Sequence, residues 1–300
     1  MSPQKTELVS DPLFQLNFLL WLTQPLPEGS SITPLFFQRN FSVYAISPAL
    51  VVPLDLQVAA QQAQIKVQPS AKPDVVLTHD VERKFAFSEC KASSFGPDST
   101  TADQARSFLV TTSSRAAEVL GLDAAQVREC LLDYLVPESQ RALLLQTLGE
   151  LTSQLSQHGL PTGNFSILGL QATNVEIVLI LDEAAAVFFS LSAGSHSVIK
   201  FQPDTDPRPL YFIPYDPDVT YASDAEKLFC KRMLFERIHG SVVVAAGRST
   251  VPAEIVLTPN GLLNDAMFGM YALWESRESA RHMRGSMQAD HARSSASGEQ

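Results

Sequence analysis

The strongest constraint on the fold is residues 84–92, KFAFSECKA, which are apolar on both alternating faces. A strand of this kind is buried on both sides of its sheet. Glu89 and Lys91 nevertheless stand inside the run. Charged side chains are costly in such a strand unless they are paired or functional. The run therefore predicts a central strand whose two charges form a pair or serve a reaction.

A second apolar strand is predicted after Pro73 and Asp74, where the sequence reads PDVVLT. A hairpin through residues 78–84 can bring Asp74 alongside Glu89. Because side chains two positions apart on a strand share a face, Glu89 and Lys91 project together. Two converging carboxylates suit Mg²⁺, a hard cation that prefers oxygen ligands. The predicted site contains Asp74, Glu89 and Lys91, with the backbone carbonyl of Cys90 as a further metal ligand.

The expected chemistry is attack of water on a phosphodiester. A divalent cation would lower the pKa of a bound water and neutralise charge on the phosphate oxygens. Lys91 would donate to the phosphate or orient the water. The Cys90 thiol is expected on the opposite face, without a catalytic role. A second acid-x-Lys triplet at residues 82–84 is assigned to an exposed polar turn.

The arrangement resembles the PD-(D/E)xK nuclease superfamily, which includes many restriction enzymes, Holliday junction resolvases and repair nucleases. The matching residues are Pro73, Asp74, Glu89 and Lys91, and the resemblance covers residues 70–112. It implies a restriction-endonuclease-like core of α+β or α/β class, a mixed sheet flanked by helices. It also implies Mg²⁺, with Mn²⁺ as a substitute, and DNA as substrate, with RNA left open.

The family's next element is a helix that often carries a polar group facing the site, and residues 99–109 fit that place. Ser99 or Thr100 can cap this helix, with Asp103 completing a capping box. Gln104 and Arg106 are the polar candidates on this helix, and Gln104 is expected to support the site. The family often has another acid on a helix before the first strand. The acids ahead of Asp74 have no such setting; they are Glu7, Asp11, Glu28 and Asp55.

The net charge of −10 argues against a freestanding DNA-binding enzyme, because phosphate neutralisation supplies most non-specific affinity. The charge is uneven: residues 1–115 hold 9 Lys and Arg against 10 Asp and Glu, whereas residues 116–300 hold 13 against 22. The basic residues near the motif are the nucleic-acid candidates, namely Arg83, Lys84, Arg106 and Arg115. A protein partner or a second copy is expected to supply part of the substrate grip.

Three domains are predicted: a nuclease core over residues 1–115, an α+β accessory or partner-binding domain over residues 116–282, and a disordered tail over residues 283–300. Helices are expected at residues 11–24, 55–65, 123–135, 137–157 and 223–238. Strands are expected at residues 41–46, 165–170, 175–181, 186–191, 198–201 and 241–246. The strands between 164 and 201 are expected to form an antiparallel meander.

Three widely spaced cysteines, Cys90, Cys130 and Cys230, are typical of reduced thiols. The chain shows no signal peptide and no apolar run long enough for a membrane span. These features predict a cytoplasmic protein without membrane contact. The predicted function is a metal-dependent endonuclease, as a component of a restriction or anti-phage defence complex. The alternative is a catalytically inactive, nuclease-like scaffold or adaptor subunit of a multiprotein complex.

Overall fold

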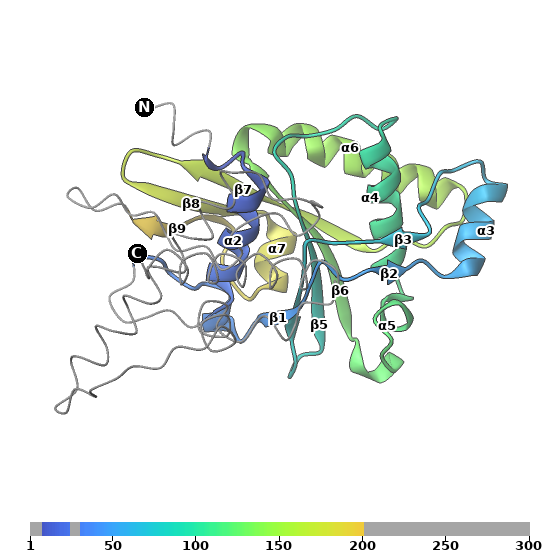
Figure 1. Ribbon diagram of the computed structural model, residues 1–300, viewed down its shortest axis with the longest axis horizontal. Helices are drawn as coiled ribbons and strands as arrows, with labels where there is room; N and C mark the ends of the chain where they lie inside the picture. The colour runs from blue at the N-terminus through green and yellow to red at the C-terminus, as the bar shows by residue number, and fades with distance from the viewer. Residues whose placement is uncertain (1–7, 25–30, 201–300) are drawn as a thin grey trace, which may run out of the picture. The chain divides into compact units, whose positions relative to one another are not determined.

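The computed structural model describes residues 8–24 and 31–200, and the centre of this part is a mixed seven-stranded sheet (Figure 1). Along the sheet the strand order is β1-β4-β5-β6-β7-β8-β9. The strand bounds are β1 Ser42–Ile46, β4 Val75–His79, β5 Lys84–Cys90, β6 Glu129–Pro137, β7 Asn164–Ala172, β8 Glu176–Leu181 and β9 Gly194–Lys200. A separate small ribbon pairs β2 (Leu50–Val51) with β3 (Ser70–Ala71). The protein is therefore α+β in class.

The middle of the sheet is parallel and its flanks are antiparallel. β4 and β5 form the antiparallel hairpin predicted from the sequence, whereas β5, β6 and β7 run parallel. Parallel neighbours need crossover connections, and helices lie within both of them: α4 (Thr100–Thr111) between β5 and β6, and α6 (Glu138–Gln157) between β6 and β7. β7, β8 and β9 form the predicted antiparallel meander.

Helices lie on both sides of the sheet. Side chains of α3 (Leu54–Gln62), α4 and α6 share one core with Phe85, Phe87 and Tyr134. On α6, the buried leucines recur at helical spacing, at positions 144, 148, 151 and 155. Figure 1 shows α2 (Pro12–Leu22) and α7 (Glu183–Phe188) on the other side of the sheet from α4. β5 is thus covered on both faces, and all seven of its residues are buried.

Local signals at two helix starts are confirmed. The side chain of Asp11 caps α2 by accepting a hydrogen bond from the Leu13 amide at 2.9 Å, with Pro12 in the first turn. Ser99 caps α4 by accepting from the Ala102 amide at 3.1 Å. The carboxylate of Asp103 instead accepts a hydrogen bond from Arg106. Both caps satisfy amides that have no partner within their helix.

Two predicted elements are wrong. Residues 123–135 form a short 3-10 helix, η2 (Ala124–Gln126), followed by the strand β6. The first half of residues 186–191 lies in α7 and the second half in the turn after it; Asp182 caps α7 by accepting from the Ala185 amide at 2.8 Å. In β6 every residue from 130 to 137 is buried. A continuous apolar run carries no period, so leucine spacing alone does not distinguish helix from strand there.

The chain does not divide after residue 115, where the sequence analysis placed a domain boundary. β5 lies before that position and β6 after it, and the two pair in register over seven residues from Lys84↔Glu129 to Cys90↔Leu135. The described residues fall within one compact unit, residues 1–207. The predictions for residues 223–238, 241–246 and 283–300 lie outside the described residues. Within the described ranges, no helix has the length and apolarity needed to cross a membrane.

Candidate active site

The hairpin of β4 and β5 brings Asp74 to the end of β5. Asp74 directly precedes β4, and the register pairs Val75 with Ser88. The Oδ2 atom of Asp74 accepts a hydrogen bond from the Cys90 backbone amide at 2.7 Å. The carboxylate of Asp74 therefore lies beside the backbone between Glu89 and Lys91, where the sequence analysis expected it.

Glu89 is the centre of this cluster and is almost completely buried. Its Oε1 atom forms an ion pair with Lys91 Nζ at 2.7 Å and accepts a hydrogen bond from Gln104 Nε2, on α4, at 3.3 Å. Its Oε2 atom is buried and has no hydrogen-bond partner among the described residues. Lys91 keeps a quarter of its side chain exposed. The cluster therefore combines a partly exposed lysine with a buried carboxylate. One oxygen of that carboxylate has hydrogen-bond partners, and the other has none among the described residues.

Burial sets the electrostatics of the cluster. Burial, and after it the charge of Asp74, raise the pKa of Glu89 to about 8 against the opposing effect of Lys91. For Lys91, burial alone lowers the pKa, but attraction to Glu89 and Asp74 outweighs it, so its pKa lies above the ordinary value. Two carboxylates beside one lysine leave an excess negative charge, which favours a cation or a proton at this point.

The metal prediction can be tested against the donor atoms present. Asp74 and Glu89 supply carboxylate oxygens, and the unpartnered Oε2 of Glu89 is a buried acceptor of the kind that a hard divalent cation satisfies. The described residues contain no group of three or more His, Cys, Asp or Glu side chains placed for a metal ion. The residues fit a cation such as Mg²⁺ that keeps several of its waters. Cys90 and Cys130 are buried free thiols.

Tyr134 joins the cluster and was missed from the sequence. It lies on β6 directly across from Glu89 in the parallel register, so the two side chains share one face of the sheet. Its hydroxyl is buried without a hydrogen-bond partner among the described residues. Burial raises the pKa of Tyr134, and the charges of Glu89 and Asp74 raise it further. Recognition of residues 129–137 as a strand would have pointed to it.

Gln15 is a second missed residue, and it supports the backbone of the cluster. It is fully buried on α2, and its Nε2 atom donates to the carbonyl of Lys91 at 3.0 Å and to that of Val9 at 2.8 Å. α2 therefore holds the chain at Lys91 from the face opposite Gln104. A glutamine inside a helix whose other residues, apart from Asn17, are apolar was the available signal, because buried polar groups are normally hydrogen-bonded.

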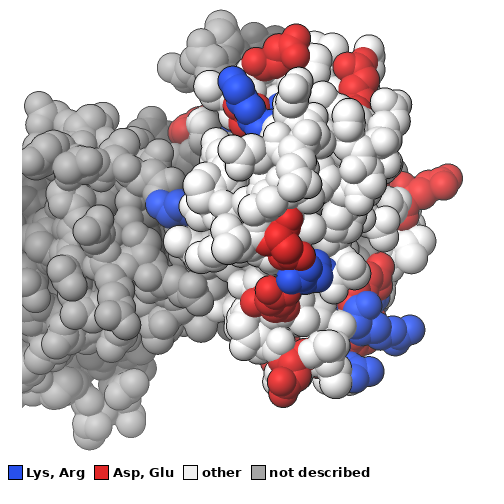
Figure 2. Space-filling view, turned by 90° about the vertical axis from the view of Figure 1, so that its right-hand side faces the viewer, with Lys and Arg blue, Asp and Glu red and all other residues white. Residues whose placement is uncertain are grey.

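The predicted nucleic-acid residues have partners inside the protein. Arg115 pairs with Asp55 at 2.7 Å and with Glu118, and Arg83 donates to the carbonyl of Ala125 at 2.7 Å. Figure 2 shows one face of the molecule, on which most blue side chains lie beside red ones without gathering into a basic patch. On that face, the described residues offer phosphate no concentrated positive charge.

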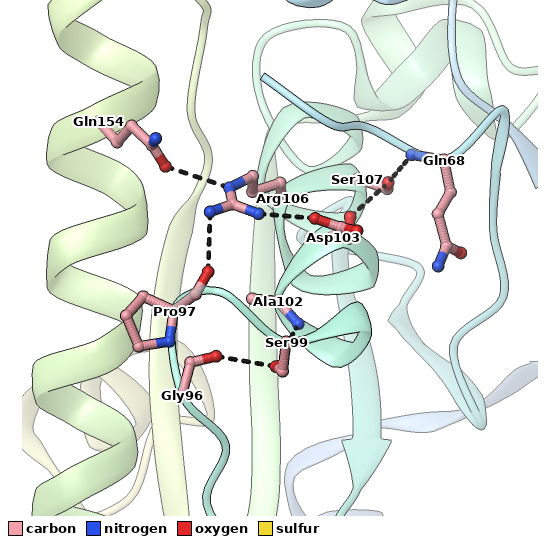
Figure 3. A network of polar contacts seen from close by, with 9 residues as sticks. All are labelled: Gln68, Gly96, Pro97, Ser99, Ala102, Asp103, Arg106, Ser107 and Gln154. Atoms are coloured by element: carbon pink, nitrogen blue, oxygen red, sulfur yellow. Dashed lines mark hydrogen bonds and ion pairs between the residues drawn. The ribbon is translucent and has the colours of Figure 1, made fainter. Parts of the chain in front are cut away.

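Arg106 is buried and connects three segments, as Figure 3 shows. Its guanidinium donates to Asp103 at 2.8 Å, to Gln154 of α6 at 3.2 Å and to the carbonyl of Pro97 at 2.8 Å. These bonds hold α4 against α6 and against the loop that precedes it. Arg106 thus has a structural place behind the cluster.

Lys84 is also buried. Its Nζ atom pairs with Glu82 at 2.6 Å and donates to the carbonyl of Phe188 at 3.1 Å. The second acid-x-Lys triplet therefore lies partly in the predicted turn and partly in β5. Its lysine, the first residue of β5, is buried, so the prediction of an exposed setting is wrong for Lys84.

A separate buried carboxylate, Asp133, faces the other side of the sheet. Asp133 lies on β6 between Ser88 and Ser166, its register partners on β5 and β7. Ser88 Oγ donates to Asp133 Oδ1 at 2.7 Å, whereas Asp133 Oδ2 and Ser166 Oγ have no hydrogen-bond partner among the described residues. Burial raises the pKa of Asp133 to about 7. Asp133 is thus not a member of the Glu89 cluster.

Comparison of the chain with protein-family models, with curated proteins and with solved structures finds no match.

Proposed function

We propose that this protein is a metal-dependent endonuclease of the PD-(D/E)xK type. The observation that carries the proposal is the convergence of Asp74, Glu89 and Lys91 at one end of β5, with an unpaired buried oxygen on Glu89. Gln104 reaches the same carboxylate from α4. The mixed sheet with helices on both sides also agrees with the restriction-endonuclease-like core that the resemblance implies.

Each residue has a role that follows from its position. Asp74 and Glu89, with the carbonyl of Cys90, would hold Mg²⁺, which activates water and neutralises charge on the phosphate. Lys91 is the partly exposed cation of the cluster, so its ammonium can contact the phosphate or orient the attacking water. Gln104 fixes the rotamer of Glu89 by donating to its Oε1 atom.

The substrate proposed is DNA, and a partner protein or a second copy supplies part of the grip. The net charge of −10 supports this division, as do the internal partners of Arg83, Lys84, Arg106 and Arg115. A component of a restriction or defence complex would work in this way. Cleavage of RNA in place of DNA would redirect the substrate assignment and leave the chemistry unchanged.

A second candidate is a catalytically inactive, nuclease-like scaffold or adaptor. The observation that favours it is the paired state of these basic side chains, together with the fact that the described residues place only two acidic side chains at the cluster. Such a protein would keep the hairpin and its ion pair as structure and would bind neither metal nor nucleic acid.

The deciding experiment incubates the purified protein with supercoiled plasmid and with linear single strands of DNA and RNA, in Mg²⁺, Mn²⁺ or EDTA. We expect metal-dependent cutting that falls about 100-fold or more in Lys91→Ala and Glu89→Gln, because each removes a group acting on the reacting centre. Lys66→Ala, a change at an exposed lysine, and Glu82→Gln, in the second triplet, are the matched controls.

Thermal melts of all variants separate loss of chemistry from loss of fold. Cutting that survives in Lys91→Ala would remove Lys91 from the mechanism. No cutting by the wild type with any substrate and metal, with or without its co-purified partners, would favour the scaffold.

A further inference from the structure

Two buried oxygens on neighbouring strands have no hydrogen-bond partner among the described residues. One is Oε2 of Glu89 on β5 and the other is the hydroxyl of Tyr134 on β6, which are register partners. Glu89 is 2% exposed and Tyr134 is fully buried. A buried polar group without a partner is costly and needs an explanation in a native structure. Two of them at one register position, on one face, point to a common cause.

Among the described residues, no group satisfies either oxygen. The two side-chain donors that reach Glu89, from Lys91 and Gln104, both go to its Oε1 atom. The aromatic ring of Tyr134 packs against Phe95, with ring centroids 6.0 Å apart. Among the described residues, Oε2 and the Tyr134 hydroxyl also make no hydrogen bond to each other. Separate contacts therefore hold the two side chains on one face of the sheet, and neither oxygen makes a hydrogen bond within the described residues.

We propose that Tyr134 is a positioning residue for a hydrated divalent cation held by Asp74 and Glu89. Its hydroxyl binds a water that accompanies the cation and so fixes the orientation of the Glu89 carboxylate. Glu89 Oε2 binds the cation itself, so one bound ion with its water satisfies both Oε2 and the Tyr134 hydroxyl. Such supporting contacts, made to groups that touch the ion, commonly change metal affinity 10–100-fold.

This inference rests on the proposed metal site but not on cleavage of nucleic acid. Its test is Mn²⁺ binding to the intact protein, measured by electron paramagnetic resonance, for the wild type and Tyr134→Phe. We expect Tyr134→Phe to weaken Mn²⁺ binding about 10–100-fold. Its melting temperature without metal should not fall, because the lost hydroxyl has no hydrogen-bond partner among the described residues. Tyr44→Phe is the control. The Tyr44 ring, on β1, packs on Phe85 of β5, the strand that carries Glu89, with ring centroids 5.3 Å apart. Mn²⁺ affinity should stay unchanged in this variant.

The outcomes separate this inference from the nuclease proposal. Weakened Mn²⁺ binding in Tyr134→Phe, with an unchanged metal-free melt, supports the role of Tyr134 even if the protein cuts nothing. Equal affinities in Tyr134→Phe and wild type overturn it while the metal site stands. Absence of Mn²⁺ binding by the wild type overturns both the inference and the metal-dependent mechanism. If Tyr134→Phe lowers the melting temperature without metal and keeps its Mn²⁺ affinity, the hydroxyl contributes only to stability. That result also overturns the inference.

Discussion

At the scale of single residues, two buried carboxylates on adjacent strands have different surroundings. Glu89 has a lysine partner at 2.7 Å and the neighbouring charge of Asp74. Asp133 has a neutral donor, Ser88, and a second unpartnered hydroxyl, Ser166, across the register. A buried carboxylate without a cation favours its protonated form. Asp133 therefore belongs to the stability of the sheet, whereas Glu89 has the composition of a site.

Asp133→Asn should change how stability depends on pH. Burial raises the pKa of Asp133 from 3.8 to about 7 in the folded protein. Its contribution to stability is therefore fully present below about pH 4 and is lost as the pH rises towards 7. Asparagine does not ionise, so the variant should lose this pH dependence. In the wild type it amounts to a change in the free energy of unfolding on the order of 2–4 kcal/mol between pH 4 and pH 8. Urea unfolding at several pH values measures it.

The control for this prediction is Asp98→Asn, at an exposed position. Its stability curve should run parallel to that of the wild type. The pKa of Glu89, about 8, lies higher, so some pH dependence remains in every variant that keeps Glu89. If Asp133→Asn also gave a parallel curve, the carboxyl of Asp133 would titrate alike in the folded and unfolded chains.

At the scale of elements, α4 links the cluster to the rest of the protein. Gln104 on this helix reaches Glu89, while Arg106 on the same helix bonds to α6 and to the preceding loop. Ser107 adds a further bond by accepting from the Gln68 amide at 2.7 Å (Figure 3). The position of Gln104 thus depends on contacts that lie behind the site.

Arg106→Ala should therefore destabilise the protein by about 2–4 kcal/mol, because it removes a buried cation and leaves its partners unpaired. Chemical unfolding measures this loss. Arg39→Ala, at an exposed arginine, should change stability by less than about 0.5 kcal/mol. Equal losses in the two variants would show that the network in Figure 3 contributes no more than a surface arginine.

At the scale of the whole molecule, a real cation site should stabilise the folded state. A ligand that binds only the folded protein adds about 2.7 kcal/mol at a concentration 100 times its Kd. Mg²⁺ or Mn²⁺ should accordingly raise the melting temperature of the wild type. The shift should disappear in Asp74→Ala and persist in Asp98→Ala. A shift that survives in Asp74→Ala would place the bound cation elsewhere on this acidic chain.

Local signals in the chain were sufficient for the elements that contain them. Asp11 and Ser99 predicted two helix starts, and the two apolar runs within residues 73–90 predicted the hairpin that places Asp74 beside Glu89. These features depend on a few consecutive residues, so no distant contact was needed to specify them. The hypothesis of a site built from Asp74, Glu89 and Lys91 came from the same short stretch.

Packing between distant segments decided the remainder. Residues 129–137 could be read as helix or strand, and only their pairing with β5 and β7 made them the centre of the sheet. That pairing alone puts Tyr134 next to Glu89, and the docking of α2 puts Gln15 on the Lys91 carbonyl. The burial of Lys84 and Arg106 was equally invisible, because Phe188 and Gln154, which accept hydrogen bonds from them, lie far along the chain. Sequence patterns report local conformation, whereas the neighbours of a side chain are determined by the tertiary fold.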